Sequence, residues 1–388
     1  MPTDICSLPA PDPLSQTHMQ TVQTHLQDLI VANGPITFAS YMQAALYAPG
    51  LGYYSAGRTK LGKSGDFVTA PEISSLFGQC IAEQCAQVLT EISDGVIFEF
   101  GAGTGKLAFD IISSLIKKNT APKNYFILEV SADLRQRQQI FLQQQLPDYF
   151  EKIIWLDQLP SKPINAVIIA NEVIDAMPVE IFQTSKKLGT HQAYVSWHDG
   201  NFKQVWQPAS EQIKQEIDNL HIDFADDYTS EINLNIKPWI KSLEQILNQG
   251  LILLIDYGFP EHEFYHADRH MGTLMCHYQH HAHSDPYILP GIQDITAHVN
   301  FTALADAADQ DHLQIEGFTT QAAFLLNCGI TQLLQKTTDN IDQYNLNQQL
   351  TQLTSPAEMG ELFKVLVLSK QLDIELLGLR QFNQIERL

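Results

Sequence analysis

The apolar residues of this chain follow two alternating periods. Short runs rich in Val, Ile, Leu and Phe are bounded by turn residues, as is typical of buried strands. Between them, apolar residues recur every three or four positions, as in helices with one buried face. The predicted strands are 96–100, 125–130, 153–156, 166–170, 250–258, 312–319 and 362–368. The pattern therefore predicts an α/β fold built on a seven-stranded sheet.

The flanking segments predict smaller elements. Apolar spacing indicates helices at 19–30 and after Thr37, whereas residues 1–17, with four prolines, are predicted to be a loose arm. Alternation over 179–207 predicts a β-hairpin or three-stranded meander. The stretch 208–235 is polar and acidic and is predicted to be an insertion.

A glycine-rich loop follows the strand at 96–100. Gly101, Gly103 and Gly105 allow a sharp turn and a close approach of the backbone to a ligand, where a Cβ would collide. From Lys106 the period becomes helical. Strand, glycine loop and helix form the first unit of a nucleotide-binding α/β fold. A tight turn without a ligand is the alternative.

The spacing of the loop indicates which nucleotide it binds. A dinucleotide fingerprint needs glycine where Lys106 stands, so a dehydrogenase is disfavoured. The motif Glu-x-Gly-x-Gly-x-Gly, from Glu99 to Gly105, resembles motif I of class I S-adenosylmethionine (SAM) methyltransferases. SAM needs acids for its amino group and its ribose. Glu99 is placed for the amino group, and Glu129, ending the next strand, is placed for the ribose.

Two later strands end in polar residues at the same predicted edge. Asn171, Glu172 and Asp175 follow the fourth strand, and Asp256 ends the fifth. Because the carboxyl ends of parallel strands line the ligand crevice, these groups are placed beside the transferable methyl group. For Asp175, the start of a helix, where acids are favoured anyway, is an equal alternative.

The segment before the glycine loop predicts a lid over the cofactor. Thr69 and Glu72 have the spacing of a capping box at the start of a long helix. A well-capped helix alone would explain these two residues. It would not explain Gly65, Asp66 and Phe67, which we therefore expect to contact the cofactor.

The tract 262–298 contains eight of the 14 histidines. Such a tract raises the alternative of a zinc site, but no cysteine or acid stands at a standard ligand spacing, so a metal is disfavoured. Asp294 and His298 are candidates for an acid–base pair. A histidine that only caps local structure is the alternative for His298.

Composition narrows the class of protein. The chain has 388 residues, 44% apolar and 17% charged, as expected of a soluble globular protein. A formal charge of −21 disfavours nucleic acid and anionic membranes as partners, and no apolar run is long enough to span a membrane. No Lys or Arg precedes Arg58, and the five cysteines form no CxxC motif. We therefore expect reduced thiols and a cytoplasmic location.

Several segments together resemble the MidA family of class I SAM-dependent methyltransferases. The loop here differs from the Gly-Pro-Gly form common in that family. The matching segments are 34–38, 52–54, 65–74, 99–105, 170–172, 175–178, 255–258 and 291–301.

The resemblance implies a Rossmann-like class I methyltransferase fold with SAM as cofactor. The expected organisation is an N-terminal arm and helical lid at 1–92 and a methyltransferase core at 93–388, with insertions near 179–235 and 259–311. The mitochondrial members symmetrically dimethylate an arginine of a complex I subunit. Because no Arg-rich presequence is recognised, we expect a bacterial member of the family, and the resemblance implies a protein client. A homodimer is one open alternative for its assembly.

The residues expected to carry catalysis are Glu172, Asp175, Asp294 and His298. Glu172, with Asp175 or Asp294, would clamp an arginine, because carboxylates hold a guanidinium bidentately. His298 would orient an acid or take up the proton. A small-molecule or RNA methyltransferase and a non-catalytic, SAM-binding assembly factor are the alternatives. The charge argues against RNA, and the retained acids argue against a non-catalytic protein.

Overall fold

The computed structural model describes residues 8–56, 69–334 and 340–388. The chain divides into two compact units, and each is described by itself. The first contains Met1–Phe67, Asp175–Ile236 and His262–His298, and the second contains Val68–Ile174, Lys237–Glu261 and Val299–Leu388. Within the described residues, no helix has the length and apolar character needed to cross a membrane.

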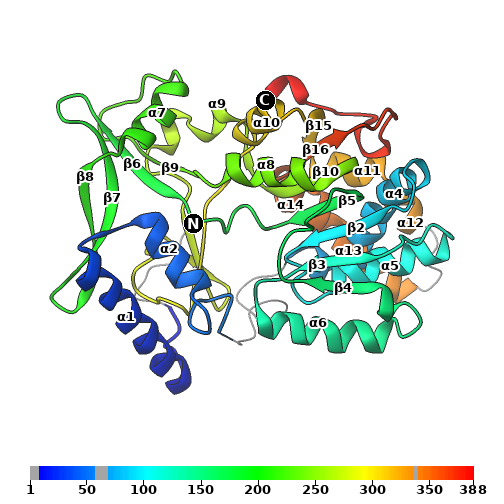
Figure 1. Ribbon diagram of the computed structural model, residues 1–388, viewed down its shortest axis with the longest axis horizontal. Helices are drawn as coiled ribbons and strands as arrows, with labels where there is room; N and C mark the ends of the chain where they lie inside the picture. Colours follow the sequence, from blue (N-terminus) through cyan, green and yellow to red (C-terminus); the bar gives the residue numbers. More distant parts are fainter. Residues whose placement is uncertain (1–7, 57–68, 335–339) are drawn as a thin grey trace. The chain divides into compact units, whose positions relative to one another are not determined.

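The second unit is built on the sheet predicted from the sequence. Its strands lie side by side in the order β15-β16-β10-β5-β2-β3-β4, with β14 added to β10 (Figure 1). Strands β4, β3, β2, β5 and β10 are mutually parallel, whereas β16 is antiparallel to both of its neighbours. The seven predicted strands are therefore confirmed. Their bounds are β2 (Val96–Phe100), β3 (Tyr125–Leu128), β4 (Ile153–Leu156), β5 (Ile164–Asn171), β10 (Leu247–Phe259), β14 (Val299–Asn300), β15 (Gln314–Thr320) and β16 (Phe363–Lys370).

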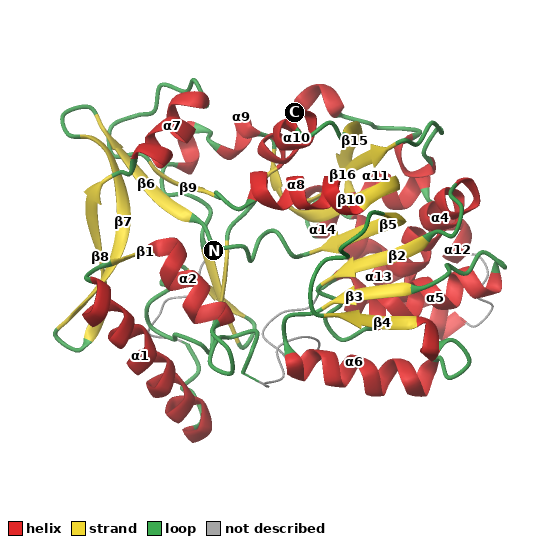
Figure 2. Ribbon diagram, in the orientation of Figure 1, coloured by secondary structure: helices red, strands yellow, loops and turns green. Residues whose placement is uncertain are grey.

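Helices cover both faces of this sheet (Figure 2). Alternate side chains such as Ile97, Val167 and Leu253 pack with buried residues of α4, α5, α11 and α13. On the opposite face, the rings of Phe100 and Trp239 lie 5.7 Å apart, which joins β2 to α8. The helices are α3 (Ala70–Ile73), α4 (Ser75–Glu91), α5 (Lys106–Lys117), α6 (Ala132–Gln145), α8 (Ile236–Ile246), α10 (Phe301–Gln310), α11 (Gln321–Asn327), α12 (Ile330–Leu334), α13 (Asn340–Thr354) and α14 (Met359–Leu362).

The first unit combines two antiparallel sheets with helices. One sheet has the order β1-β7-β6-β9 with β8 paired to β7, which confirms the predicted meander, and the other has the order β12-β11-β13. Leu26, Met42 and Val195 belong to the apolar core that joins α1 and α2 to the first sheet. The elements are α1 (Pro13–Asn33), β1 (Ile36–Thr37), α2 (Phe38–Tyr47), β6 (Glu180–Ser185), β7 (Gly189–His198), β8 (Asn201–Pro208), α7 (Glu211–Asn219), β9 (Thr229–Ile232), α9 (Glu261–Phe264), which begins in the second unit, β11 (Met275–Tyr278), β12 (His281–His283) and β13 (Asp294–Thr296).

The structure corrects the prediction for the chain's beginning. The first helix starts at Pro13, so a loose arm over 1–17 is wrong for residues 13–17. The reason is local. The carboxylate of Asp12 accepts hydrogen bonds from the backbone N–H groups of Leu14 and Ser15, and proline suits the first helical position.

The predicted capping box is also wrong. Thr69 precedes only the short α3 and makes no side-chain capping bond, and the long helix α4 begins at Ser75. Its cap is Ser74, whose hydroxyl accepts from the N–H of Leu76 at 3.3 Å. Glu72 instead accepts a hydrogen bond from the hydroxyl of Thr104, at 2.5 Å.

Replacing the observed cap should therefore destabilise the protein more than replacing the expected one. Ser74→Ala should lower the free energy of unfolding by about 1 kcal/mol, the usual value of an N-cap bond. Thr69→Ala is the matched control and should change it by less. Thermal and urea unfolding of both variants measure the difference, and equal effects would contradict the assignment of Ser74 as the cap.

Candidate active site

Three parallel strands of the second unit end level with one another. Phe100 of β2 is paired in register with Leu128 of β3 and with Ala170 of β5. Asn171 of β5 is in turn paired with Ile255 of β10. The loops that follow these strands therefore start at a common edge, as predicted from the sequence.

The loop after β2 has the backbone that its glycines predict. Gly101, Gly103 and Gly105 have φ values of 60°, 54° and 86°, in the left-handed region that favours glycine. Gly101 is exposed at the strand end, and α5 begins at Lys106. The amine of Lys106 binds the carboxylate of Asp110 at 3.0 Å and so stays on the helix. The loop therefore presents backbone at the sheet edge, as a close ligand contact requires.

Glu99 lies beneath this loop and is 2% exposed. It accepts a hydrogen bond of 2.7 Å from the hydroxyl of Tyr125. Burial raises the pKa of Glu99 to about 8, the bond from Tyr125 opposes the shift, and the charge of Glu129 adds to it. The structure therefore brings the two predicted cofactor acids into electrostatic contact. A cation beside Glu99 would favour its ionised form.

Glu129 is fixed by donors to each of its oxygens. Its Oε1 accepts from the backbone N–H of Ser131 at 2.9 Å, and its Oε2 accepts from the amide of Gln138 at 2.9 Å. The same amide of Gln138 donates to the carbonyl of Gly103, at 2.9 Å. The predicted ribose acid and the glycine loop are thus joined through one side chain.

Asn171 and Glu172 stand together at the end of β5. Glu172 has a φ of 53°, which is uncommon for a residue with a side chain and is often found at functional sites. Its Oε1 accepts from the amide of Asn171 at 3.2 Å and from the backbone of Ala70 at 3.3 Å. Among the residues that the structure describes, the buried Oδ1 of Asn171 has no hydrogen-bond partner. A buried acceptor of this kind fits a ligand donor.

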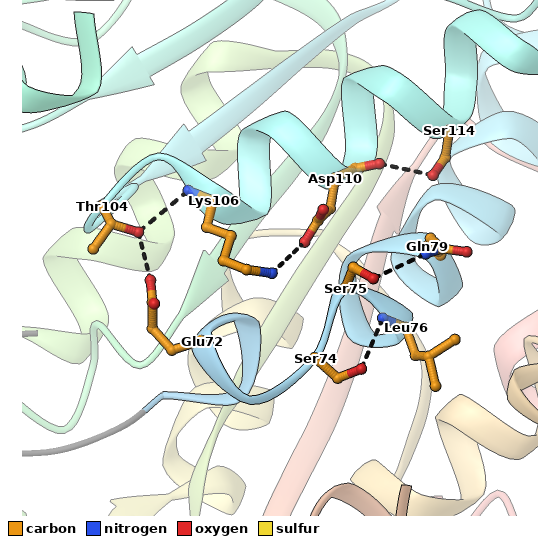
Figure 3. A network of polar contacts seen from close by, with 9 residues as sticks. All are labelled: Glu72, Ser74, Ser75, Leu76, Gln79, Thr104, Lys106, Asp110 and Ser114. Carbon is orange, nitrogen blue, oxygen red and sulfur yellow. Dashed lines mark hydrogen bonds and ion pairs between the residues drawn. The ribbon is translucent and has the colours of Figure 1, made fainter. Parts of the chain in front are cut away.

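The start of the long helical segment is tied to the glycine loop. Glu72 of α3 binds the Thr104 hydroxyl, which also accepts from the N–H of Lys106 at 3.4 Å (Figure 3). The predicted cofactor residues Gly65, Asp66 and Phe67 lie outside the described residues, so the lid stays a prediction.

Asp175 and Asp294 belong to the first unit, where Tyr54 connects them. The Tyr54 hydroxyl donates to the two carboxylate oxygens of Asp294, at 2.9 and 3.0 Å. Burial raises the pKa of Tyr54 well above its usual value, and the charges of Asp294, Tyr47 and Asp175 add to that effect. Two acids of the predicted catalytic set, 7% and 1% exposed, therefore lie within electrostatic reach of one tyrosine.

His298 belongs to the same unit but lies in a different environment. Its backbone N–H donates to the hydroxyl of Thr273 at 3.1 Å. Burial lowers the pKa of His298 to about 4, so the ring is neutral at pH 7. Its pairing with Asp294 stays a prediction.

The histidine-rich tract forms part of a small sheet. His277 lies on β11 opposite Asp294, and His281 and His283 lie on β12. Burial lowers the pKa of both His277 and His283. In the part of the chain that the structure describes, no group of three or more His, Cys, Asp or Glu residues is arranged to hold a metal ion.

Comparison with known proteins identifies the family. Residues 80–319 match the S-adenosyl-L-methionine-dependent methyltransferase family Methyltransf_28. The crystal structure of a COG1565 superfamily member from Burkholderia thailandensis, bound to S-adenosyl-homocysteine, is 39% identical, with a TM-score of 0.94 over 98% of this chain and 100% of that one. The chain belongs to this methyltransferase family. The class I, Rossmann-like fold and the MidA-type resemblance are both confirmed.

More distant relatives carry a more specific name. The mitochondrial protein arginine methyltransferase NDUFAF7 of Rattus norvegicus is 28% identical over 91% of this chain and 85% of its own length. The human protein of the same name is 29% identical over 89% of this chain and 82% of its own length.

SAM is the cofactor of this methyltransferase, and the residues at the sheet edge fit it. The glycine loop offers exposed backbone, Asn171 offers an unsatisfied acceptor, and Glu99 is a buried carboxyl that a cationic amino group would complement. The roles of individual residues stay predictions.

Sequence reasoning missed one participant in this site, Gln138. It lies in a helix with six glutamines, in which no single one stands out. A signal was nevertheless present. Leu134, Gln138 and Leu142 share the buried face of α6 at four-residue spacing, and a polar residue in such a stripe needs a partner.

A side chain at Gly103 should prevent cofactor binding. In Gly103→Val, a β-branched residue would have to adopt a left-handed φ and would fill the backbone surface of the loop. Gly200→Val is a matched control, since Gly200 has a φ of 81° in the β7–β8 turn and open space around it. Isothermal titration should detect SAM binding by the control and none by Gly103→Val. Wild-type affinity in a folded Gly103→Val variant would remove the loop from the site.

The raised pKa of Glu99 predicts a proton release. Below about pH 8 the carboxyl is mostly protonated, and a bound ammonium would favour its ionised form. At pH 7, SAM binding should therefore expel a proton, measured by titration calorimetry in buffers of different ionisation enthalpy. Glu99→Gln should abolish this release, whereas the exposed Glu151→Gln should keep it. An unchanged release in Glu99→Gln would assign the proton to another group.

Proposed function

We propose that this methyltransferase transfers the methyl group to an arginine side chain of a protein client. The main support is the acidic cluster of the first unit, in which Tyr54 holds both oxygens of the buried Asp294 and lies within reach of the charge of Asp175. The named arginine methyltransferase relatives support the same acceptor. From the resemblance to the MidA family, we extend the proposal to a client in respiratory complex assembly.

A buried carboxylate suits a guanidinium. Asp294 accepts from Tyr54 at both oxygens and from the backbone N–H of Ile295 at Oδ1, so in this proposal its negative charge is what attracts the planar cation. A guanidinium keeps its charge at neutral pH, and the acid offsets that charge on desolvation. In this proposal, Asp294 and Asp175 orient the acceptor.

Bound SAM supplies an electrophilic methyl group on a sulfonium. In the transfer, a nitrogen lone pair of the guanidinium forms the new N–C bond, the S–C bond breaks, and its electron pair stays on sulfur. The nitrogen loses one proton. Chain residues contribute mainly by positioning and by charge stabilisation.

The proton acceptor is better sought among the carboxylates than at His298. With its pKa lowered to about 4, His298 is a weak base at pH 7. Glu172, in the second unit, is the acid that follows the end of β5 directly. We therefore assign proton uptake to Glu172 and a positioning role to His298.

Other functions fit less well. The buried acids near Tyr54 favour a cationic acceptor over a neutral small molecule, and the presence of Glu129, Glu172 and Asp175 disfavours a non-catalytic binder. The formal charge of −21 opposes RNA. We extend the proposal to a cytoplasmic location, which is supported by the free, buried thiols of Cys80, Cys85, Cys276 and Cys328. We also propose a homodimer as the alternative to a monomer.

Neutralising Glu172 or Asp294 one at a time should distinguish SAM binding from methyl transfer. Glu172→Gln and Asp294→Asn should keep SAM affinity and each lower the rate of methyl transfer by about a hundredfold or more, the scale for losing a positioned charge or acid–base group. The assay uses labelled SAM with lysate proteins of a strain lacking this chain, followed by hydrolysis and identification of the methylated amino acid.

The exposed Asp199→Asn is the control and should transfer at the wild-type rate. Label recovered as methylarginine is the expected result. Label on lysine or on a small molecule, or near wild-type transfer by both acid variants, would refute the arginine acceptor.

A further inference from the structure

The amide of Gln138 lies between the two parts of the cofactor site. Its Nε2 donates to the carbonyl of Gly103 and to Oε2 of Glu129, each at 2.9 Å. Its Oε1 accepts from the indole Nε1 of Trp155, also at 2.9 Å. The side chain is fully buried in α6. One amide therefore connects the loop after β2 to the acid after β3.

The orientation of this amide follows from its partners. An indole N–H can only donate, so it must face the amide oxygen. A backbone carbonyl and an ionised carboxylate can only accept, so both must face the amide nitrogen. In this orientation the two N–H groups of the amide face the carbonyl of Gly103 and the carboxylate of Glu129. In the reversed orientation, the amide oxygen would face these two acceptors. Trp155 thus fixes which end of Gln138 points to the site.

The amide of Gln138 is needed between the Gly103 carbonyl and the Glu129 carboxylate because these two acceptors repel one another. A carbonyl oxygen and a carboxylate oxygen approach closely only with a donor between them. The second oxygen of Glu129 is held independently by Ser131. A donor on each oxygen fixes the direction of the carboxylate.

We propose that Gln138 is a positioning residue for the cofactor, which sets the glycine loop and the carboxylate of Glu129 at the separation that SAM spans. The proposal rests on the ribose role predicted for Glu129 and is independent of the methyl acceptor. A purely structural glutamine in the helix would instead affect stability and leave ligand recognition unchanged.

The test compares two buried glutamines of the same unit. Gln138→Leu keeps the size of the side chain and removes its three hydrogen bonds. Gln84→Leu is the matched control, because Gln84 is 1% exposed and its amide binds Gln87 and the backbone of Gly378, each at 2.9 Å. The measured quantity is the affinity for S-adenosyl-homocysteine by titration calorimetry, so catalysis is not needed.

Gln138→Leu should weaken binding by about tenfold to a hundredfold, the scale of lost hydrogen bonds to a charged group. Trp155→Phe, which keeps a ring but loses the donor, should weaken it by less and serves where Gln138→Leu folds poorly. Gln84→Leu should bind as the wild type does.

An analogue lacking the ribose 2′-hydroxyl distinguishes positioning from general damage. Wild-type protein should bind this analogue more weakly than S-adenosyl-homocysteine, and Glu129→Gln should reduce that difference. If Gln138 orients Glu129, then Gln138→Leu or Trp155→Phe should reduce it too. The proposal is overturned if the difference in affinity between the two ligands keeps its wild-type value in both Gln138→Leu and Trp155→Phe. It is also overturned if Gln138→Leu binds S-adenosyl-homocysteine as tightly as Gln84→Leu does.

Discussion

The burial of the central strands on both faces is the constraint on which the second unit depends. Strands β2, β5 and β10 are mostly apolar and packed against helices, so the two faces of the sheet are not accessible to a ligand. Their polar groups lie at or near the strand ends, among them Glu99, Asn171 and Asp256. Because the strands are parallel and in register, those points coincide at one edge. The predicted location of the cofactor site is thus a consequence of packing.

The backbone N–H groups at that edge also need hydrogen-bond acceptors. Asp256 is fully buried near the end of β10, and its Oδ2 accepts from the N–H groups of Val173 and Ile174 at 3.3 and 3.0 Å. The N–H of Glu172 donates to the carbonyl of Ile255. These bonds hold the chain just after its left-handed turn at Glu172, so the neighbouring strand stabilises the strained residue. Asp256 therefore supports the predicted site through the backbone that follows β5.

The sequence predicted what depends on local pattern. Apolar runs located the strands, and the spacing of Gly101, Gly103 and Gly105 identified the cofactor class, since both are properties of contiguous residues. Sequence could not choose between Thr69 and Ser74 as a cap, because both residues suit that position. Nor could it find Gln138 or the link from Tyr54 to Asp294, whose partners lie 35 and 240 residues away. Such contacts are set by tertiary packing.

The donors around a buried carboxylate separate structural acids from those that bind ligands. Burial raises the pKa of Glu231, yet the N–H groups of Thr273 and Leu274 and the Thr273 hydroxyl all donate to its carboxylate. Glu99 is buried as deeply and, among the described residues, accepts only from Tyr125. A carboxyl with so few donors must either keep a proton or gain a cation. Glu231 has no such need, so we expect a cationic cofactor to lower the free energy at Glu99 and to leave Glu231 unaffected.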